Sequence, residues 1–190
     1  MAKKYYNEEK YKEALIEFKN TVQIDQKYAD GYYQMGLTYL KLQELQEAYG
    51  SLQKTVELDP NHLKAQLAIG EILLLARQSD QALEKADLVL GKDPENKEAL
   101  QLKGNCLLLK KDLDGAMEQA RKVLAKEPSS VDVRIFIAQI YDMKKEIVEA
   151  EKILLEALNI DKKNIKTYIT LARFYQAHQN PDKAEEALKQ

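Results

Sequence analysis

The side chains in this chain that could do chemistry are two histidines, one cysteine and neighbouring carboxylates. Their spacing in the sequence is not typical of any reactive site. His62 and His178 lie far apart in the sequence, and Cys106 is the single cysteine. Zinc sites draw on short spacings such as Cys-x2-Cys or His-x3-His, and neither spacing occurs. A glycine-rich phosphate loop is also missing. The sequence therefore predicts no metal and no cofactor.

Paired carboxylates, which could serve general acid–base catalysis, occur as Glu8-Glu9 and Glu185-Glu186. Both pairs fall on polar helix faces, which favours a solvated surface. Asn180-Pro181 predicts a helix start, with Asn180 as the cap and Pro181 in the first turn. Because no catalytic constellation is visible, we predict that the chain is not an enzyme.

The elements that position these side chains follow a period of 34 residues. Asp59-Pro60 returns as Asp93-Pro94 and as Glu127-Pro128. A proline cannot continue a helix and biases the preceding residue away from helical geometry, so each pair predicts the end of one helix and the turn into the next. A fixed period of this length predicts a repeat array.

Two columns of small residues recur when Ala29 is counted as the first position of a repeat. The twentieth position is always alanine, and the eighth is always glycine or alanine. Small residues let two helices of a hairpin cross closely. The columns are Ala14, Ala48, Ala82, Ala116, Ala150 and Ala184, and Ala2, Gly36, Gly70, Gly104, Ala138 and Ala172. We expect twelve helices and no strands, with hairpin turns near Gln43-Glu44, Arg77-Gln78, Lys111-Asp112, Lys145-Glu146 and Gln179-Asn180.

The motif Tyr32-x2-Met35-Gly36-x2-Tyr39, followed by Ala48, Leu52 and Pro60, resembles the tetratricopeptide repeat. Gln66 and Arg134 depart from the family pattern, since they stand where it has an aromatic residue. The resemblance implies an all-α fold, a right-handed superhelical solenoid of six tandem 34-residue helix-turn-helix repeats, with the first and last truncated.

The repeat register predicts a single array over residues 1–190. Its boundaries are 1–28 (partial), 29–62, 63–96, 97–130, 131–164 and 165–190 (partial). We expect the chain to be an excerpt of a longer array; the alternative is a short protein whose ends stack on another copy.

Composition narrows the range of partners. The 29 lysine and arginine residues nearly balance the 31 aspartate and glutamate residues, so the net charge of −2 does not favour nucleic acid. The longest apolar stretch, EILLLA, is too short to span a bilayer, so no direct membrane insertion is expected. Cys106 is interpreted as a buried structural thiol.

A partner-binding surface is predicted on the first helix of each pair, which lines the concave wall of such a stack. Its leucines exceed what an exposed face should carry, and contiguous exposed apolar surface usually marks a partner site. The alternative is that Leu75, Leu109, Leu74 and Leu108 rotate into the hairpin core. The predicted groove residues are Tyr33, Leu37, Leu40, Lys41, Leu67, Glu71, Leu74, Gln101, Asn105, Leu108, Ile135, Gln139, Asp142, Ile169 and Arg173.

One binding mode of the family is a clamp of lysines and asparagines that grips the terminal carboxylate of a chaperone. Asn105 and Lys166 fall on two of its five positions, whereas Gln101, Phe136 and Thr170 occupy the others. We therefore do not expect that mode.

The leading hypothesis is a non-enzymatic protein–protein interaction scaffold that binds a partner segment in its concave groove. The alternative is a self-assembly module, a homo-oligomer that stacks through repeat ends or groove. An accessory domain of an enzyme located elsewhere in a parent chain also stays open. Residues 5–42 and 82–116 resemble bacterial tetratricopeptide lipoproteins of exopolysaccharide and exosortase systems. That resemblance implies a cell-envelope location, periplasmic or lipoprotein-anchored, with the cytoplasm as the alternative.

Overall fold

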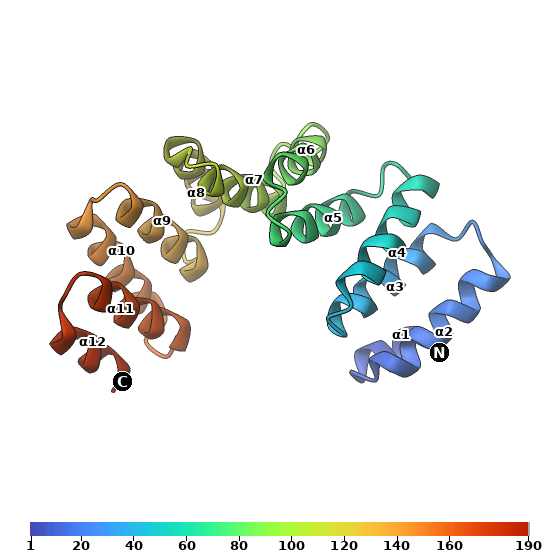
Figure 1. Ribbon diagram of the computed structural model, residues 1–190, viewed down its shortest axis with the longest axis horizontal. Coiled ribbons are helices and arrows are strands. Elements are labelled where there is room, and N and C mark those ends of the chain that lie inside the picture. Colours follow the sequence, from blue (N-terminus) through green and yellow to red (C-terminus); the bar gives the residue numbers. More distant parts are fainter. Residues whose placement is uncertain (190) are drawn as a thin grey trace. The chain divides into compact units, whose positions relative to one another are not determined.

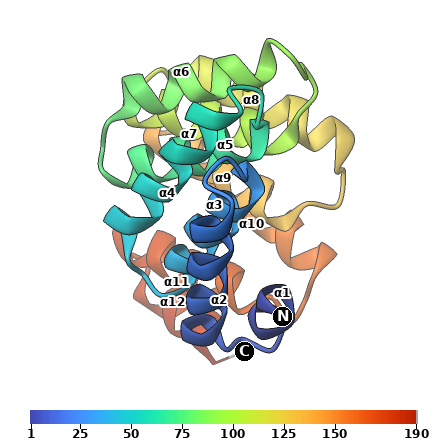
Figure 2. The same ribbon diagram turned by 90° about the vertical axis from the view of Figure 1, so that its right-hand side faces the viewer.

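Twelve α-helices make up the computed structural model, which describes residues 1–189 and contains no strand in that range. The first helices of the six hairpins are α1 (Ala2–Asn7), α3 (Ala29–Lys41), α5 (Leu63–Leu75), α7 (Lys97–Leu109), α9 (Val131–Met143) and α11 (Ile165–Ala177). The second helices are α2 (Tyr11–Ile24), α4 (Leu45–Leu58), α6 (Ser79–Leu90), α8 (Leu113–Lys126), α10 (Ile147–Ile160) and α12 (Pro181–Leu188). Consecutive helices pack as hairpins, and α11 and α12 lie side by side in both ribbon views (Figure 1, Figure 2). The predicted all-α repeat fold is confirmed.

The chain divides into two compact units, which we call the N-terminal unit (Met1–Leu102) and the C-terminal unit (Lys103–Gln190). The division falls within α7. Each unit has its own core. Leu52 and Ile69 are fully buried in the N-terminal unit, and Leu154 and Leu171 lie in the core of the C-terminal unit. Within residues 1–189, no helix is both long and apolar enough to cross a membrane.

The acid of the repeated acid-proline pair acts as a turn former. Asp59 has an extended backbone and its Oδ1 accepts a hydrogen bond from the Asn61 amide at 3.0 Å. Asp25 and Asp161 accept equivalent bonds, although neither precedes a proline. An aspartate that bonds its own backbone two residues on builds a turn by itself. The interhelix turn therefore tolerates the loss of the proline.

The predicted turns inside the hairpins are confirmed. Each first helix is followed, two positions beyond its last residue, by a residue with positive φ, and all six of these residues are other than glycine. Glu44 N–H donates to Tyr39 O at 2.9 Å beyond one of them, a bond that closes the helix end. The six residues are Glu9, Gln43, Arg77, Lys111, Lys145 and Gln179.

The alanine column lies at the helix crossing, as predicted. Ala48, Ala82 and Ala116 are fully buried, and Ala184 exposes only 3% of its surface. A Cβ on Gly36 would lie 3.4 Å from Ala48 O, and one on Gly70 would lie 3.6 Å from Ala82 O. The eighth and twentieth positions therefore meet where the two helices approach most closely.

Candidate partner-binding surface

The predicted groove residues fall on the first helices of both units, and each unit is described by itself. We call the N-terminal set the N-terminal face, and the C-terminal set the C-terminal face. The N-terminal face consists of Tyr33, Leu37, Leu40, Lys41, Leu67, Glu71, Leu74 and Gln101. The C-terminal face consists of Asn105, Leu108, Ile135, Gln139, Asp142, Ile169 and Arg173.

On the N-terminal face, Leu37, Leu40 and Leu74 are half-buried, so part of each leucine stays in water. Lys41, Glu71 and Gln101 are exposed. Leu67 departs from the prediction, because only 8% of its surface is exposed. Its helix, α5, packs against both α4 and α6, and this contact covers residues Ala65–Gly70. Leu67 therefore belongs to the core beneath the face.

Aromatic rings meet on the N-terminal face. Tyr33 of α3 contacts His62, the residue that caps α5, with ring centroids 4.5 Å apart. His62 is held by its capping role, since its Nδ1 accepts the Ala65 amide at 3.1 Å. Desolvation raises the pKa of Tyr33, and the charges of Asp30 and Glu71 add to the rise. Glu71 therefore lies close enough to Tyr33 to act on it.

Asp30 sits beside this face and has three partners. It accepts hydrogen bonds from Lys3 Nζ at 3.3 Å, Tyr28 Oη at 3.2 Å and Gln34 Nε2 at 3.4 Å. Burial alone would raise the pKa of the Asp30 carboxyl. The hydrogen bonds from Gln34 and Lys3 outweigh burial, so the pKa is lowered. The negative charge of Asp30 is thus internally compensated.

Glu71 is in the opposite situation. Desolvation first, and then the charge of Glu98 on α7, raise the pKa of the Glu71 carboxyl. Glu71 is exposed by surface area, yet protein surrounds its carboxylate closely enough to remove part of its hydration. Among the described residues, neither Glu71 nor Glu98 forms an ion pair or a hydrogen bond through its side chain. The charge of Glu98 therefore acts on the Glu71 carboxyl, and neither carboxylate has an ion-pair partner among the described residues.

On the C-terminal face, Gln139, Ile169 and Arg173 are exposed, whereas Asn105, Ile135 and Asp142 are half-buried. Leu108 was predicted as a surface residue and is buried, with 8% of its surface exposed. Its neighbour Leu109 was a candidate for the core and exposes 51%. An apolar side chain at the edge of a helix seam folds onto the adjoining helix when space allows, since this removes it from water.

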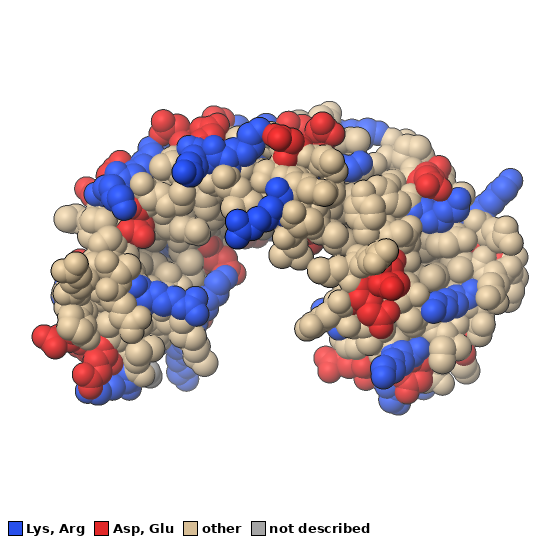
Figure 3. Space-filling view, viewed as in Figure 1, with Lys and Arg blue, Asp and Glu red and all other residues tan. Residues whose placement is uncertain are grey.

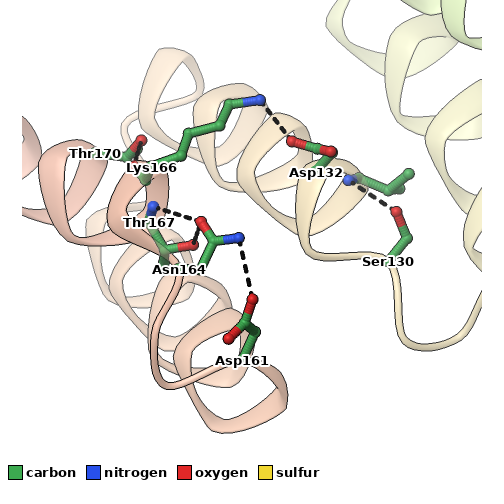
Figure 4. A network of polar contacts seen from close by, with 8 residues as sticks. Ser130, Asp132, Asp161, Asn164, Lys166, Thr167 and Thr170 are labelled. Carbon is green, nitrogen blue, oxygen red and sulfur yellow. Dashed lines mark hydrogen bonds and ion pairs between the residues drawn. The ribbon is translucent and has the colours of Figure 1, made fainter.

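Polar contacts tie successive first helices of the C-terminal unit together. Asp142 Oδ1 lies 2.7 Å from His178 Nε2, and the His178 ring also packs against Phe174 at 4.6 Å. Lys166 reaches from α11 to Asp132 on α9, next to the caps formed by Asn164 and Ser130 (Figure 4). The Asp142 carboxylate is thus already engaged in a hydrogen bond with His178 of the same chain.

Two depressions lie away from these faces. One, of about 540 Å³, lies among α4, α5 and α6 beside Leu45, Tyr49 and Leu75. Leu75, considered above as a core candidate, exposes 69% of its surface. The other, of about 320 Å³, lies among α10, α11 and α12, with Tyr168 and Leu171 in its lining. Both are mainly apolar, and neither brings together a catalytic set of side chains.

The sequence prediction missed three contributors to these faces. His62 and His178 were not assigned to the surface, although they contact Tyr33 and Asp142. Glu98 was left out of the predicted groove. A signal for Glu98 was available, because it follows Glu71 by the same interval that separates Lys3 from Asp30.

Comparison with known families identifies the chain. Tetratricopeptide repeat family models match residues 29–62, 76–130 and 107–164, and together they span more than half of the chain. The chain therefore belongs to the tetratricopeptide repeat family. None of the curated proteins compared with it matches.

Solved structures share the fold at low sequence identity. PilW, described as a widely conserved type IV pilus biogenesis factor, has a TM-score of 0.87 at 16% identity, over 98% of this chain and 86% of PilW. MamA from Desulfovibrio magneticus RS-1 has a TM-score of 0.79 at 21% identity, over 86% of this chain and 92% of MamA. YrrB, described as a TPR protein with an unusual peptide-binding site, has a TM-score of 0.72 at 21% identity, over 87% of this chain and 86% of YrrB. At these identities the likeness concerns the fold.

Proposed function

We propose that this tetratricopeptide repeat protein is a non-enzymatic scaffold that binds a segment of another protein on its first helices. The observation that carries the proposal is the partial exposure of Leu37, Leu40 and Leu74 on the adjacent first helices α3 and α5. Covering the exposed part of such leucines with a partner gains free energy. The peptide-binding site described for YrrB supports this reading.

Net charge does not select the partner. Lysine and arginine side chains are interspersed with aspartate and glutamate over the surface in view (Figure 3). A partner segment must then be recognised through local contacts. The proposal includes the 34-residue boundaries and the single array given above, and it excludes nucleic acid as the partner.

The test separates folding from binding. Replacing Leu40 or Leu74 by serine should lower the free energy of unfolding less than the same change at a fully buried leucine, because both side chains are already partly in water. Leu67→Ser is the matched control, and it should lower the free energy of unfolding by about 2–5 kcal/mol because it removes a buried side chain. Proteins captured by the wild-type chain and identified by mass spectrometry should be lost with the Leu40/Leu74 variant. Unchanged capture would contradict the proposed surface.

Self-assembly is the second candidate. Ile165 and Ile169 of α11 expose 73% and 39% of their surfaces, which favours coverage by another molecule. Light scattering over a concentration series should then show oligomers that Ile165→Ser and Ile169→Ser abolish. A strict monomer at all concentrations would exclude this candidate.

A role in a bacterial envelope assembly or export system is the finer part of the proposal. The description of PilW as a pilus biogenesis factor supports it. Cell fractionation with the native gene product tests it, and recovery solely in the cytoplasmic fraction would contradict it.

A further inference from the structure

Tyrosine side chains gather in the first part of the N-terminal unit. Eight of the eleven tyrosines of the chain lie within residues 1–49. Two of them, Tyr6 on α1 and Tyr33 on α3, belong to successive first helices, and both are half-buried. Part of each ring is therefore open to a partner.

A contact between α1 and α3 places these two rings beside each other. Lys3 Nζ lies 3.3 Å from Asp30 Oδ2, so the two helices meet at these residues. Both helices pack against α2 through short turns and therefore run in the same direction. Tyr6 follows Lys3 by three residues and Tyr33 follows Asp30 by three, which puts both rings one turn further along the same helical faces. After desolvation, Tyr6 is among the neighbours that raise the pKa of Tyr33, as this closeness requires.

Ring contacts extend the pair into a row. Tyr11, the first residue of α2, packs edge-on against Tyr6 with ring centroids 5.5 Å apart. His62 packs against Tyr33 with ring centroids 4.5 Å apart, and its capping bond to the Ala65 amide fixes its own position. We call Tyr11, Tyr6, Tyr33 and His62 the aromatic row. Because each tyrosine of α1 and α3 is braced by a second ring, little side-chain freedom is lost when a ligand covers it.

The polar groups of the row indicate an uncharged ligand. Lys3, the cation one turn before Tyr6, is neutralised by Asp30, so the row offers no net positive charge to a phosphate or a carboxylate. Among the described residues, the hydroxyls of Tyr6 and Tyr33 form no hydrogen bond, which leaves two phenol donors open. Aromatic faces combined with open donors match a ligand that carries apolar rings and unpaired carbonyl groups.

A proline-rich segment has both features. In the polyproline II conformation it has no internal hydrogen bonds, and rings on the same side recur about every 9 Å. Neighbouring packed helices lie about 8–10 Å apart, so rings on α1 and α3 repeat at a similar interval. The conformation is also preformed, which lowers the entropy cost of binding.

We propose that the N-terminal unit binds a proline-rich segment of another protein in the polyproline II conformation, with pyrrolidine rings stacked on Tyr6 and Tyr33. The two tyrosine hydroxyls donate hydrogen bonds to carbonyl groups of the segment. This inference rests on the proposed function of the first helices and specifies the chemistry of the partner. Leu37 and Leu40 follow Tyr33 on the same face of α3, so apolar residues that flank the prolines find a surface there.

Fluorescence polarisation with fluorescein-labelled nonaproline and the full 190-residue chain tests the inference. Nonaproline should bind, and a labelled glycine–serine peptide of equal length should not. The Tyr6→Ala/Tyr33→Ala variant should bind nonaproline at least about tenfold more weakly, because two ring contacts and two hydrogen bonds are lost. Tyr49→Ala is the matched control, since Tyr49 is a half-buried tyrosine on α4 outside the row, and it should leave affinity unchanged. Equal affinity of the wild type and the Tyr6→Ala/Tyr33→Ala variant, or no binding by the wild type, would overturn the inference.

A second variant guards against loss of folding when two half-buried rings are removed. Tyr6→Phe/Tyr33→Phe keeps both rings and should melt close to the wild type, which circular dichroism checks. It lacks both hydroxyl donors and should bind nonaproline about threefold or more weakly. Unchanged affinity would overturn the assigned hydrogen bonds.

An oligosaccharide is the alternative ligand, because sugar rings also stack on aromatic faces. Maltohexaose binding that calorimetry detects and that Tyr6→Ala/Tyr33→Ala abolishes, without binding of nonaproline, would overturn the inference in favour of a carbohydrate site.

Selection from a random-sequence peptide display library on the same chain separates this inference from the proposed function. Enriched peptides that lack prolines and lose binding to the Leu40→Ser/Leu74→Ser variant would refute the proline assignment and leave the first helices as the binding surface. Enriched peptides that bind the tyrosine and leucine variants as tightly as the wild type would refute both.

Discussion

Gly36 and Leu52 are in contact so close that no side chain fits between them. A Cβ on Gly36 would lie 2.7 Å from Leu52 Cγ, and Leu52 is fully buried. The leucine cannot retreat without disturbing the hairpin core. The small eighth position of the repeat is therefore a steric requirement at this hairpin.

Gly36→Ala should destabilise the protein despite the better helix propensity of alanine. Overpacking at such a contact typically costs about 1–3 kcal/mol. Gly50→Ala is the matched control, because a Cβ there meets nothing within 4 Å and the residue is exposed in α4. That variant should gain about 0.5–1 kcal/mol from the lower backbone entropy of the unfolded state. Urea denaturation measures both, and shifts in the same direction would contradict the steric explanation.

Ala116→Leu should be strongly destabilising, with a loss of about 1–3 kcal/mol or more, because the alanine column lies at a close helix crossing. Ala116 is fully buried. Ala125→Leu, at an exposed position of the same helix, should have little effect. The comparison uses thermal melting followed by circular dichroism. A melting temperature unaffected by Ala116→Leu would show that the column is not a packing contact.

Arg77→Gly should stabilise the protein. Arg77 has φ of 59°, and a left-handed backbone costs an L-residue about 1–2 kcal/mol. Glycine removes this strain. The greater conformational entropy of glycine in the unfolded state cancels only part of the gain. The preceding Ala76 has φ of −76°, so Ala76→Gly has no strain to relieve and should be destabilising. Opposite shifts in the urea midpoint are expected. A loss of stability in both variants would mean that the turn carries no strain.

Glu71→Gln should stabilise the protein near neutral pH and lose this effect in acid. The carboxyl pKa in the folded protein is raised above its ordinary value of 4.5, so the native state holds the proton more tightly than the unfolded state does. Stability from this group is fully present below the unfolded pKa and is lost as pH rises through the folded pKa. Urea midpoints at about pH 7 and about pH 3 measure the difference.

Glu47→Gln is the control for charge removal alone, since Glu47 is exposed on α4. A gain from Glu71→Gln that is equal at both pH values, or that Glu47→Gln matches, would show that the desolvation of Glu71 and the charge of Glu98 are not its cause.

Much of the secondary structure could be read from local patterns. Helix α3 begins at Ala29 and α5 at Leu63, where the 34-residue register places the first position. Asn180 caps α12, with its Oδ1 accepting the Lys183 amide at 3.3 Å. These features depend on interactions within a few residues, such as caps, turns and the spacing of small side chains. A periodic sequence repeats such interactions at every turn of the array.

Which side chains of the predicted binding surface are exposed depended on tertiary structure. Periodicity placed Leu67, Leu74 and Leu108 on the inward faces of their helices, yet Leu67 and Leu108 are buried while Leu74 is only half-buried. The repeat register could place Glu71 opposite Glu98, but only the arrangement of α5, α6 and α7 decided that no cation of the same unit reaches them. Burial and electrostatic compensation depend on neighbours distant in sequence. The sequence by itself therefore determined the helices and their hairpins, whereas packing between hairpins decided which side chains are open to a partner.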